Sequence, residues 1–143
     1  MHIPGHLAVA LLEHRLLTTF LPDQKFVAPL FIASFFPDVV DKTIGYILHW
    51  MPNGRHYSHN IFSLALFTGL VSLIGGKAAG VGWFAGHFGH MLIDIRKSRS
   101  IVPWLFPLKR YTFYPGKLRL RPRRFFKESL LLAAVLLFLR LMR

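Results

Sequence analysis

The 143-residue sequence contains no cysteine, which excludes disulfides, thiolate metal sites and cysteine nucleophiles. It also has few acids, and a bound metal would have to use histidine and carboxylate ligands. The six carboxylates are Glu13, Asp23, Asp38, Asp41, Asp94 and Glu128. The sequence has no serine-triad motif, no phosphate-binding glycine loop and no dinucleotide fingerprint, so none of these supports an enzyme class.

What the chain has in excess is apolar surface and positive charge. Hydrophobic residues make up 53% and the formal net charge is +12, with a pI of about 11.0 and a mean hydropathy of +0.42. This combination is unusual for a soluble enzyme and typical of a membrane protein whose basic loops face anionic lipid. The first residues lack a basic segment and a small-residue cleavage site, so we expect no cleaved signal peptide.

Apolar runs predict a single helical membrane domain over residues 1–143. Helix-compatible runs cover 5–21, 26–37 with a continuation from Pro37 over 38–51, 60–76, 78–95 and, at the end, 128–142. Between the last two lies a basic, proline- and aromatic-rich segment, 96–127. We predict an all-α integral membrane bundle of about four to six helices arranged as hairpins. The runs are short for a bilayer core, which needs roughly 20 residues, and a very apolar soluble bundle is the alternative.

Hairpins would bring polar residues from distant parts of the chain to one end of the bundle. The positive-inside rule places 96–127 in the cytoplasm of a multi-pass inner-membrane protein. If 60–76 crosses outward and 78–95 returns, His59 and His90 end at the same level. The first two runs would likewise bring His6 and Asp38 together. We therefore expect a site near the cytoplasmic face.

The motif GHFGHMLID places His87, His90 and Asp94 at i, i+3 and i+7, on one helical face. His90 and Asp94 can bind one cation from consecutive turns. Ionisable residues inside membrane segments are costly and usually face an interior or a cavity. The alternative is a histidine satisfied by a carbonyl, with Asp94 marking the helix end; for this cluster we favour ligands.

Two further motifs carry polar residues one turn apart. In FFPDVVDK, Asp38 and Asp41 either bind a metal or cap a helix and pair with Lys42. In GRHYSHN, Arg55 lies beside two histidines and can hold a phosphate or orient a carboxylate. His59, which directly precedes an apolar run, is the better ligand candidate there; a solvated basic loop is the alternative.

Together these motifs predict a metal site with nitrogen and oxygen ligands. The candidate ligands are His6, Asp38, Asp41, His59, His90 and Asp94, with Arg55 and Asp41 as candidate catalytic residues. Such a set suits a divalent metal, Zn²⁺ first and Mn²⁺ or Fe as alternatives. A metal with an open position activates water and polarises a phosphoryl or carbonyl oxygen.

The same blocks resemble the membrane-bound metal-dependent hydrolase family, the YdjM-like inner-membrane proteins. The blocks, in order, are Gly5-His6, Pro37-Asp38-Val39-Val40-Asp41-Lys42, Arg55-x-x-Ser58-His59, His90-x-x-x-Asp94 and Trp104-Leu105-Phe106-Pro107. The resemblance covers about residues 5–110 and implies a helical membrane protein with a metal-dependent hydrolase site. Gly54 stands where some members carry a histidine, and His56 and His87 match no position of the pattern.

The first functional hypothesis is therefore a membrane-bound metal-dependent hydrolase acting on a phosphoester at the membrane surface. Its expected partners are membrane lipids and a small or lipid-derived substrate; Arg55 would stabilise the anionic group. A non-enzymatic ion- or proton-binding transport protein is the second hypothesis. Nucleic-acid binding by the basic segment 96–127 is the least favoured, because it leaves the aligned histidines and aspartates without a role.

Overall fold

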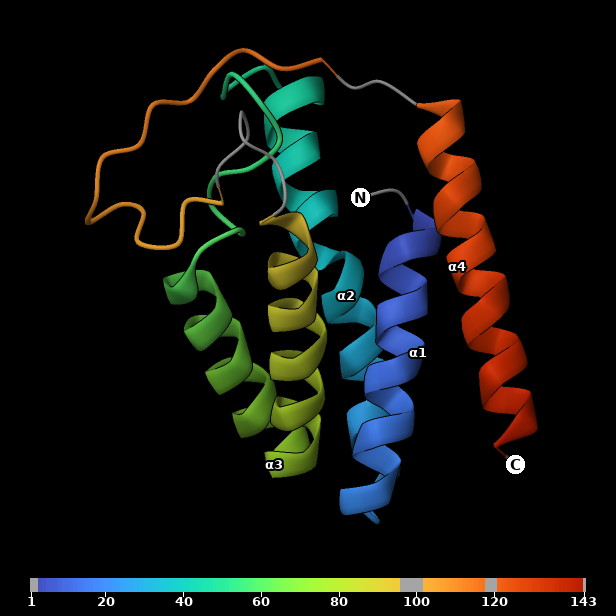
Figure 1. Ribbon diagram of the computed structural model, residues 1–143. Helices are drawn as coiled ribbons and strands as arrows, with labels where there is room; N and C mark the ends of the chain where they lie inside the picture. The colour runs from blue at the N-terminus through green and yellow to red at the C-terminus, as the bar shows by residue number, and fades with distance from the viewer. Residues whose placement is uncertain (1–2, 96–101, 118–120, 143) are drawn as a thin grey trace.

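The protein is built from helices alone over the part of the chain that the computed structural model describes, residues 3–95, 102–117 and 121–142. No strand occurs in these ranges, which confirms the all-α class (Figure 1). In chain order the elements are α1 (Ile3–Phe20), the 3-10 turn η1 (Gln24–Phe26), α2 (Val27–Lys42), the π-helical turn η2 (Thr43–Ile47), α3 (Ile61–Asp94) and α4 (Pro122–Leu141).

The long helix α3 is a hairpin with two antiparallel arms. Gly76 has φ 84° and ψ 175°, a conformation that glycine adopts without steric cost. The chain reverses there, between arms 61–75 and 77–94 (Figure 1). The rings of Phe67 and Trp83 lie 5.9 Å apart across the arms. The predicted hairpin of 60–76 and 78–95 is confirmed, and His59 and His90 lie at the same end of it.

Helices α1 and α2 form a second hairpin, also as predicted. Its turn is capped by Asp23, whose side chain accepts a hydrogen bond from the backbone N–H of Lys25 at 3.0 Å. Fully buried Ala10, Phe26 and Leu30 form the apolar core between the two helices. This packing carries the end of α2 back to the level at which α1 begins (Figure 1).

The end of α2 differs from the sequence-based expectation. Pro37 lies inside the helix rather than at the start of a new one, and it leaves one helical hydrogen bond unmade because it has no N–H. The predicted helix over 38–51 extends four residues too far: α2 ends at Lys42, η2 continues it to Ile47, and 48–51 are not helical. At Gly45 an added Cβ would lie 2.1 Å from the carbonyl oxygen of Asn53. The chain therefore folds back against η2 at this glycine.

The final helix begins at Pro122, six residues before the predicted start at 128. Proline at the first turn of a helix loses no hydrogen bond, because that N–H has no helical partner. Arg124 and Glu128 then form an i, i+4 ion pair at 3.7 Å. Helix α4 packs against α1 (Figure 1). Of the predicted basic segment 96–127, residues 96–101 and 118–120 lie outside the described residues, and 102–117 crosses the end of the bundle without helix.

Among the described residues, α3 is the one helix long and apolar enough to cross a membrane; the other helices fall short in length or hydropathy. Because it folds back at Gly76, each arm is only roughly 22–27 Å long at about 1.5 Å per residue. A bilayer core is about 30 Å thick. Leu73 and Ile74 at the hairpin tip are 85% and 88% exposed, which suits side chains that contact lipid.

Glycines let α3 approach α2 closely. An added Cβ at Gly82 would lie 2.1 Å from the carbonyl oxygen of Phe26, and one at Gly86 would lie 2.1 Å from that of Leu30. These glycines are one turn apart, so two successive turns of α3 contact the backbone at Phe26, the last residue of η1, and at Leu30 in α2. Close helix contact through small residues is the usual mode of packing in membranes, where burial from water contributes little.

We expect Gly82→Ala to destabilise the bundle by about 1–3 kcal/mol, because the added methyl group forces the two backbones apart. Thermal unfolding of the detergent-solubilised protein would measure the effect. Gly69→Ala is the matched control, since an added Cβ there meets nothing within 4 Å. Equal midpoints for the two variants would contradict the close approach.

Candidate metal centre

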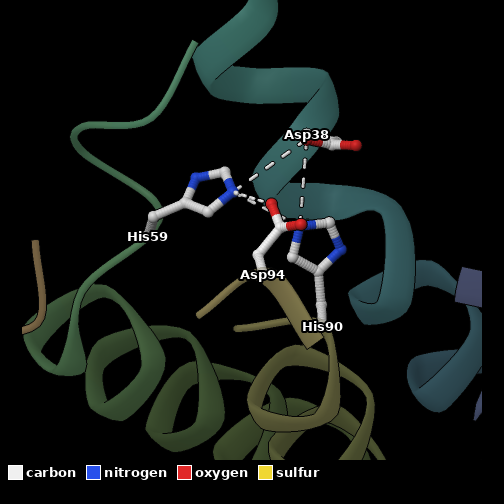
Figure 2. A group of neighbouring side chains, drawn as sticks. All are labelled: Asp38, His59, His90 and Asp94. Carbon is white, nitrogen blue, oxygen red and sulfur yellow. Dashed lines mark hydrogen bonds and ion pairs between the residues drawn. The ribbon is translucent and has the colours of Figure 1, made fainter. Parts of the chain in front are cut away.

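Four potential metal ligands converge from three parts of the chain. Asp38 comes from the last turns of α2, His59 from the loop before α3, and His90 and Asp94 from the end of the second arm of α3 (Figure 2). One ligand atom from each lies within 4.8 Å of the others. Only Asp38 retains some exposure, with its side chain 14% exposed. The group can hold a metal ion with two nitrogen and two oxygen ligands.

The two histidines face each other through their Nε2 atoms, which are 3.3 Å apart. His59 donates its Nδ1–H to Asp41 Oδ2 at 2.7 Å, and His90 donates its Nδ1–H to the carbonyl oxygen of Ser34 at 2.7 Å. Because a carboxylate and a carbonyl can only accept, each neutral ring carries its proton on Nδ1 and its lone pair on Nε2. Two lone pairs directed at each other repel, and a cation between them removes the repulsion.

The carboxylates complete a site of suitable size. Asp38 Oδ1 lies 4.0 Å from His59 Nε2 and 3.9 Å from His90 Nε2, and Asp94 Oδ2 lies 3.8 Å from His59 Nε2. Zinc bonds of about 2.0–2.2 Å in tetrahedral geometry place ligand atoms about 3.3–3.6 Å apart. All four ligand atoms lie within 4.8 Å of one another, so a modest inward movement of the side chains would let them bind one ion.

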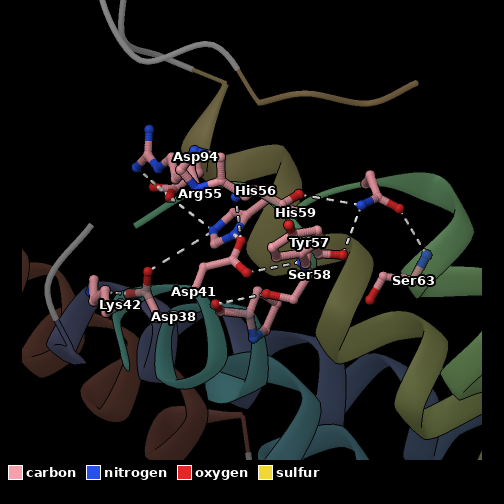
Figure 3. A network of polar contacts seen from close by, with 12 residues as sticks. Asp38, Asp41, Lys42, Arg55, His56, Tyr57, Ser58, His59, Ser63 and Asp94 are labelled. Carbon is pink, nitrogen blue, oxygen red and sulfur yellow. Dashed lines mark hydrogen bonds and ion pairs between the residues drawn. The ribbon is translucent and has the colours of Figure 1, made fainter. Parts of the chain in front are cut away.

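Asp41 organises the loop that carries His59. Its carboxylate accepts the backbone N–H of His56 at 2.5 Å and that of Ser58 at 3.0 Å, in addition to the ring N–H of His59 (Figure 3). The hydroxyl of Ser58 donates to the carbonyl of Pro37 at 2.9 Å. Fully buried Asp41 thus lies behind His59, where it fixes the tautomer and orientation of that ring.

Two side-chain cations contact the ligand carboxylates. Arg55 Nη2 donates to Asp94 Oδ2, and Lys42 Nζ donates to Asp38 Oδ2 at 2.5 Å (Figure 3). These contacts match two of the interpretations drawn from the sequence, in which Arg55 orients a carboxylate and Lys42 pairs with an aspartate one turn away. Lys42 thus contacts Asp38 through the oxygen that faces away from the two histidines, whereas Arg55 contacts Asp94 through Oδ2, the oxygen that also faces His59.

His6, the sixth predicted ligand, lies beside the four-residue cluster. It is 2% exposed, and its ring stacks on His90 with centroids 4.0 Å apart and an interplanar angle of 6°. Its Nε2 is 3.7 Å from Asp38 Oδ2. Neither ring nitrogen has a hydrogen-bond partner among the described residues. The structure thus brings together four of the six predicted ligands, with Asp41 behind His59 and His6 adjacent.

Two histidines outside the predicted ligand set, His56 and His87, support the loop. His87 donates from Nε2 to the carbonyl oxygen of Ser58 at 2.8 Å. The ring of His56 is 1% exposed and packs 4.2 Å from the ring of Phe113. Burial lowers the pKa of His56, and the nearby Asp41 carboxylate only partly offsets this, so the ring is neutral at pH 7.

Segment 102–117 covers this loop from outside. The backbone N–H of Ile61 donates to the carbonyl of Trp104 at 3.0 Å, and that of Gly116 to the carbonyl of Pro52 at 2.9 Å. Asn53 donates from Nδ2 to the carbonyl of Tyr114 at 3.0 Å. The segment that the charge pattern identified as basic and interfacial is therefore also the outer support of the His59 loop.

Sequence reasoning missed the contacts made through backbone atoms. The carbonyl oxygen of Ser34 holds His90, and no residue type signals such a role. The packing of Phe113 on His56 joins positions far apart in the chain, and nothing in the local pattern of either segment indicates it.

The profile of the YdjM inner membrane protein family matches residues 1–143 of this chain. The chain belongs to that family. No curated protein and no solved structure matches the chain. Family membership establishes a membrane protein and confirms the resemblance found in residues 5–110. The name of the YdjM inner membrane protein family describes a location and no reaction, so the chemistry has to be inferred from the site.

We expect Asp41→Asn to weaken zinc binding by about 10–100-fold, the usual effect of removing the partner of a ligating histidine. An amide oxygen cannot replace a carboxylate that accepts three hydrogen bonds, so the ring of His59 loses its fixed orientation. Competition titration with a chromophoric chelator would measure the affinity. Asp23→Asn, in the turn at the far end of the bundle, is the control; equal affinities in both variants would contradict the role of Asp41.

Proposed function

We propose that the protein is a metal-dependent hydrolase that cleaves a phosphoester at the membrane surface. One divalent metal ion binds to His59, His90, Asp38 and Asp94. The observation that carries this proposal is the opposed pair of Nε2 lone pairs, each fixed by a hydrogen bond at Nδ1. Histidine rings held in this way are prepared for metal binding rather than for a contact with each other.

The donor set favours zinc. Two imidazole nitrogens, two carboxylate oxygens and no sulfur suit Zn²⁺ in a four-coordinate site, and Mn²⁺ or Fe²⁺ accept the same ligands. A bound ion would lower the pKa of a coordinated water and polarise a phosphoryl oxygen. Asp38 and Lys42 form the partly exposed edge of the centre, and water and substrate would enter there.

Charge supports an anionic substrate. With a divalent ion in place, the positive charges of the ion, Lys42 and Arg55 exceed the negative charges of Asp38, Asp41 and Asp94. A phosphoester would therefore be attracted to the site, and the guanidinium group of Arg55 would stabilise charge that develops on its oxygens. Asp41, the second predicted catalytic residue, contributes by holding His59 rather than by contacting the substrate.

The arrangement of charge also supports a multi-pass protein with the site at the cytoplasmic face. The metal centre, the His59 loop and segment 102–117 lie at one end of the bundle (Figure 1). Segment 102–117 contributes Lys109, Arg110 and Lys117 at this end, and basic residues are retained on the cytoplasmic side. In this orientation the substrate is drawn from the cytoplasmic side or from the inner leaflet.

Ion or proton transport is the second candidate. It is favoured by Glu13, which lies inside the bundle against Gly89; an added Cβ at that glycine would be 1.8 Å from Glu13 Oε1. Its Oε2 atom is buried and has no hydrogen-bond partner among the described residues. Acids within membrane bundles commonly mark ion or proton paths.

Hydrolysis of p-nitrophenyl phosphate or of a phospholipid phosphomonoester in nanodiscs tests the proposal. We expect activity that is lost with EDTA, restored by Zn²⁺ or Mn²⁺, and reduced about 100-fold or more in His90→Ala, because a catalytic metal contributes several kcal/mol. His49→Asn is the control: His49 is exposed, and its φ of 56° suits asparagine.

Two outcomes would contradict the hydrolase. One is the absence of phosphate release from either substrate by metal-loaded protein. The other is a proton or metal flux across reconstituted vesicles that His90→Ala abolishes while no hydrolysis occurs, which would establish transport instead.

A further inference from the structure

The carboxylate of Asp38 faces two separate positions. Its Oδ1 atom points to the lone pairs of His59 and His90, at 4.0 and 3.9 Å. Its Oδ2 atom points the other way, to His6 Nε2 at 3.7 Å and Lys42 Nζ at 2.5 Å. A carboxylate directed in this way can bridge two cations, one on each oxygen. The first position is the four-ligand centre, and the second lies between Asp38 Oδ2 and His6.

His6 is the observation that makes the second position a candidate ligand site. Its ring is 2% exposed, and neither nitrogen has a hydrogen-bond partner among the described residues. Burial of an unpaired polar group costs free energy, so such a group calls for a partner. Parallel stacking on His90 holds the ring beside the metal centre with Nε2 directed at Asp38. The separation of 3.7 Å between Nε2 and Oδ2 suits two ligands of one cation.

The ammonium group of Lys42 already provides a positive charge at this position. Lys42 reaches Asp38 from one turn along α2, and its side chain is 37% exposed. Lysine ammonium is a compact point charge, and it repels a divalent ion that would share the same oxygen. The protein can therefore have the ammonium group or a second metal ion on Asp38 Oδ2, but not both.

We propose that Asp38 Oδ2 and His6 Nε2 form a second cation position, which Lys42 fills with its own ammonium group. The protein thus binds one metal ion, and Lys42 takes the place of a second. Two cations that flank a carboxylate resemble the paired-metal arrangement that clamps a transferring phosphoryl group. This last consequence rests on the proposed hydrolase; the number of bound ions does not.

Removal of the ammonium group should open the second position to metal. The test uses the whole 143-residue chain in nanodiscs, loaded with Mn²⁺ and freed of excess ion by gel filtration. Bound metal is counted by mass spectrometry, and electron paramagnetic resonance detects magnetic coupling between two neighbouring ions. We expect one ion and no coupling in the wild type, but a second, coupled ion in Lys42→Met.

Control variants separate this effect from general changes in charge. Lys25→Met removes a lysine in the turn between α1 and α2, at the other end of the bundle, and should still bind one ion. Lys42→Arg keeps the charge and should also bind one. His6→Phe combined with Lys42→Met keeps the ring stacked on His90 but removes the ligand, and should return the count to one. A monodisperse gel-filtration profile shows that each variant is folded, and Lys42→Gln replaces Lys42→Met if that variant is not.

The outcomes distinguish the two proposals. Two ions in the wild type overturn the proposal that Lys42 fills the second position, and one ion in folded Lys42→Met overturns the position itself. Both results leave the four-ligand centre intact. No bound ion in the wild type removes the metal centre and with it both proposals. A second ion that persists in the His6→Phe double variant shows that His6 is not its ligand, and also overturns the inference.

Discussion

The buried carboxylate of Asp41 connects the parts of the protein on which the candidate site depends. It accepts hydrogen bonds from two backbone N–H groups of the loop and from the ring of His59. This single group therefore joins the end of α2 to the segment that leads into α3. Without it, the ring of His59 would lose the hydrogen bond at Nδ1 that fixes its orientation, although His87 and segment 102–117 would still hold the loop. The Nε2 atoms of His59 and His90 face each other because each ring is held by a hydrogen bond at Nδ1. Asp41 accepts this bond from His59, and the carbonyl oxygen of Ser34 accepts it from His90.

Two helical hairpins provide the scaffold for this arrangement. Reversal of the chain at Gly76 returns α3 to its starting level, and the α1–α2 turn does the same for the first hairpin. Close contact of α3 with α2 at Gly82 then sets their separation. The polar centre forms at one end of an apolar bundle, and large apolar side chains such as Leu73 are exposed at the hairpin tip. Ionisable side chains are costly to place inside a bilayer. Here they lie at one end of the helical bundle and pair with each other, so the site is compatible with a membrane.

Periodicity and residue type predicted the all-α class, both hairpins and the convergence of His59, His90, Asp38 and Asp94. Hairpin geometry alone places the ends of consecutive helices at one level, so these predictions needed no knowledge of side-chain contacts. The boundaries near Pro37 and Pro122 were wrong because tertiary contacts and helix-start chemistry decided them rather than the apolar pattern. The separate role of Asp41 could not be predicted, since Asp38 and Asp41 are alike in sequence and only the path of the loop decides which one meets the backbone N–H groups.

In the proposed metal centre, two imidazoles and two carboxylates bind one ion. X-ray absorption spectroscopy of the zinc-loaded protein reports the ligand types directly. We expect a first shell of nitrogen and oxygen at about 2.0–2.1 Å, with outer-shell scattering from two imidazole rings that falls to one ring in His90→Ala. An imidazole signal that is the same in the wild type and in His90→Ala, or a shell of water oxygens alone, would contradict it.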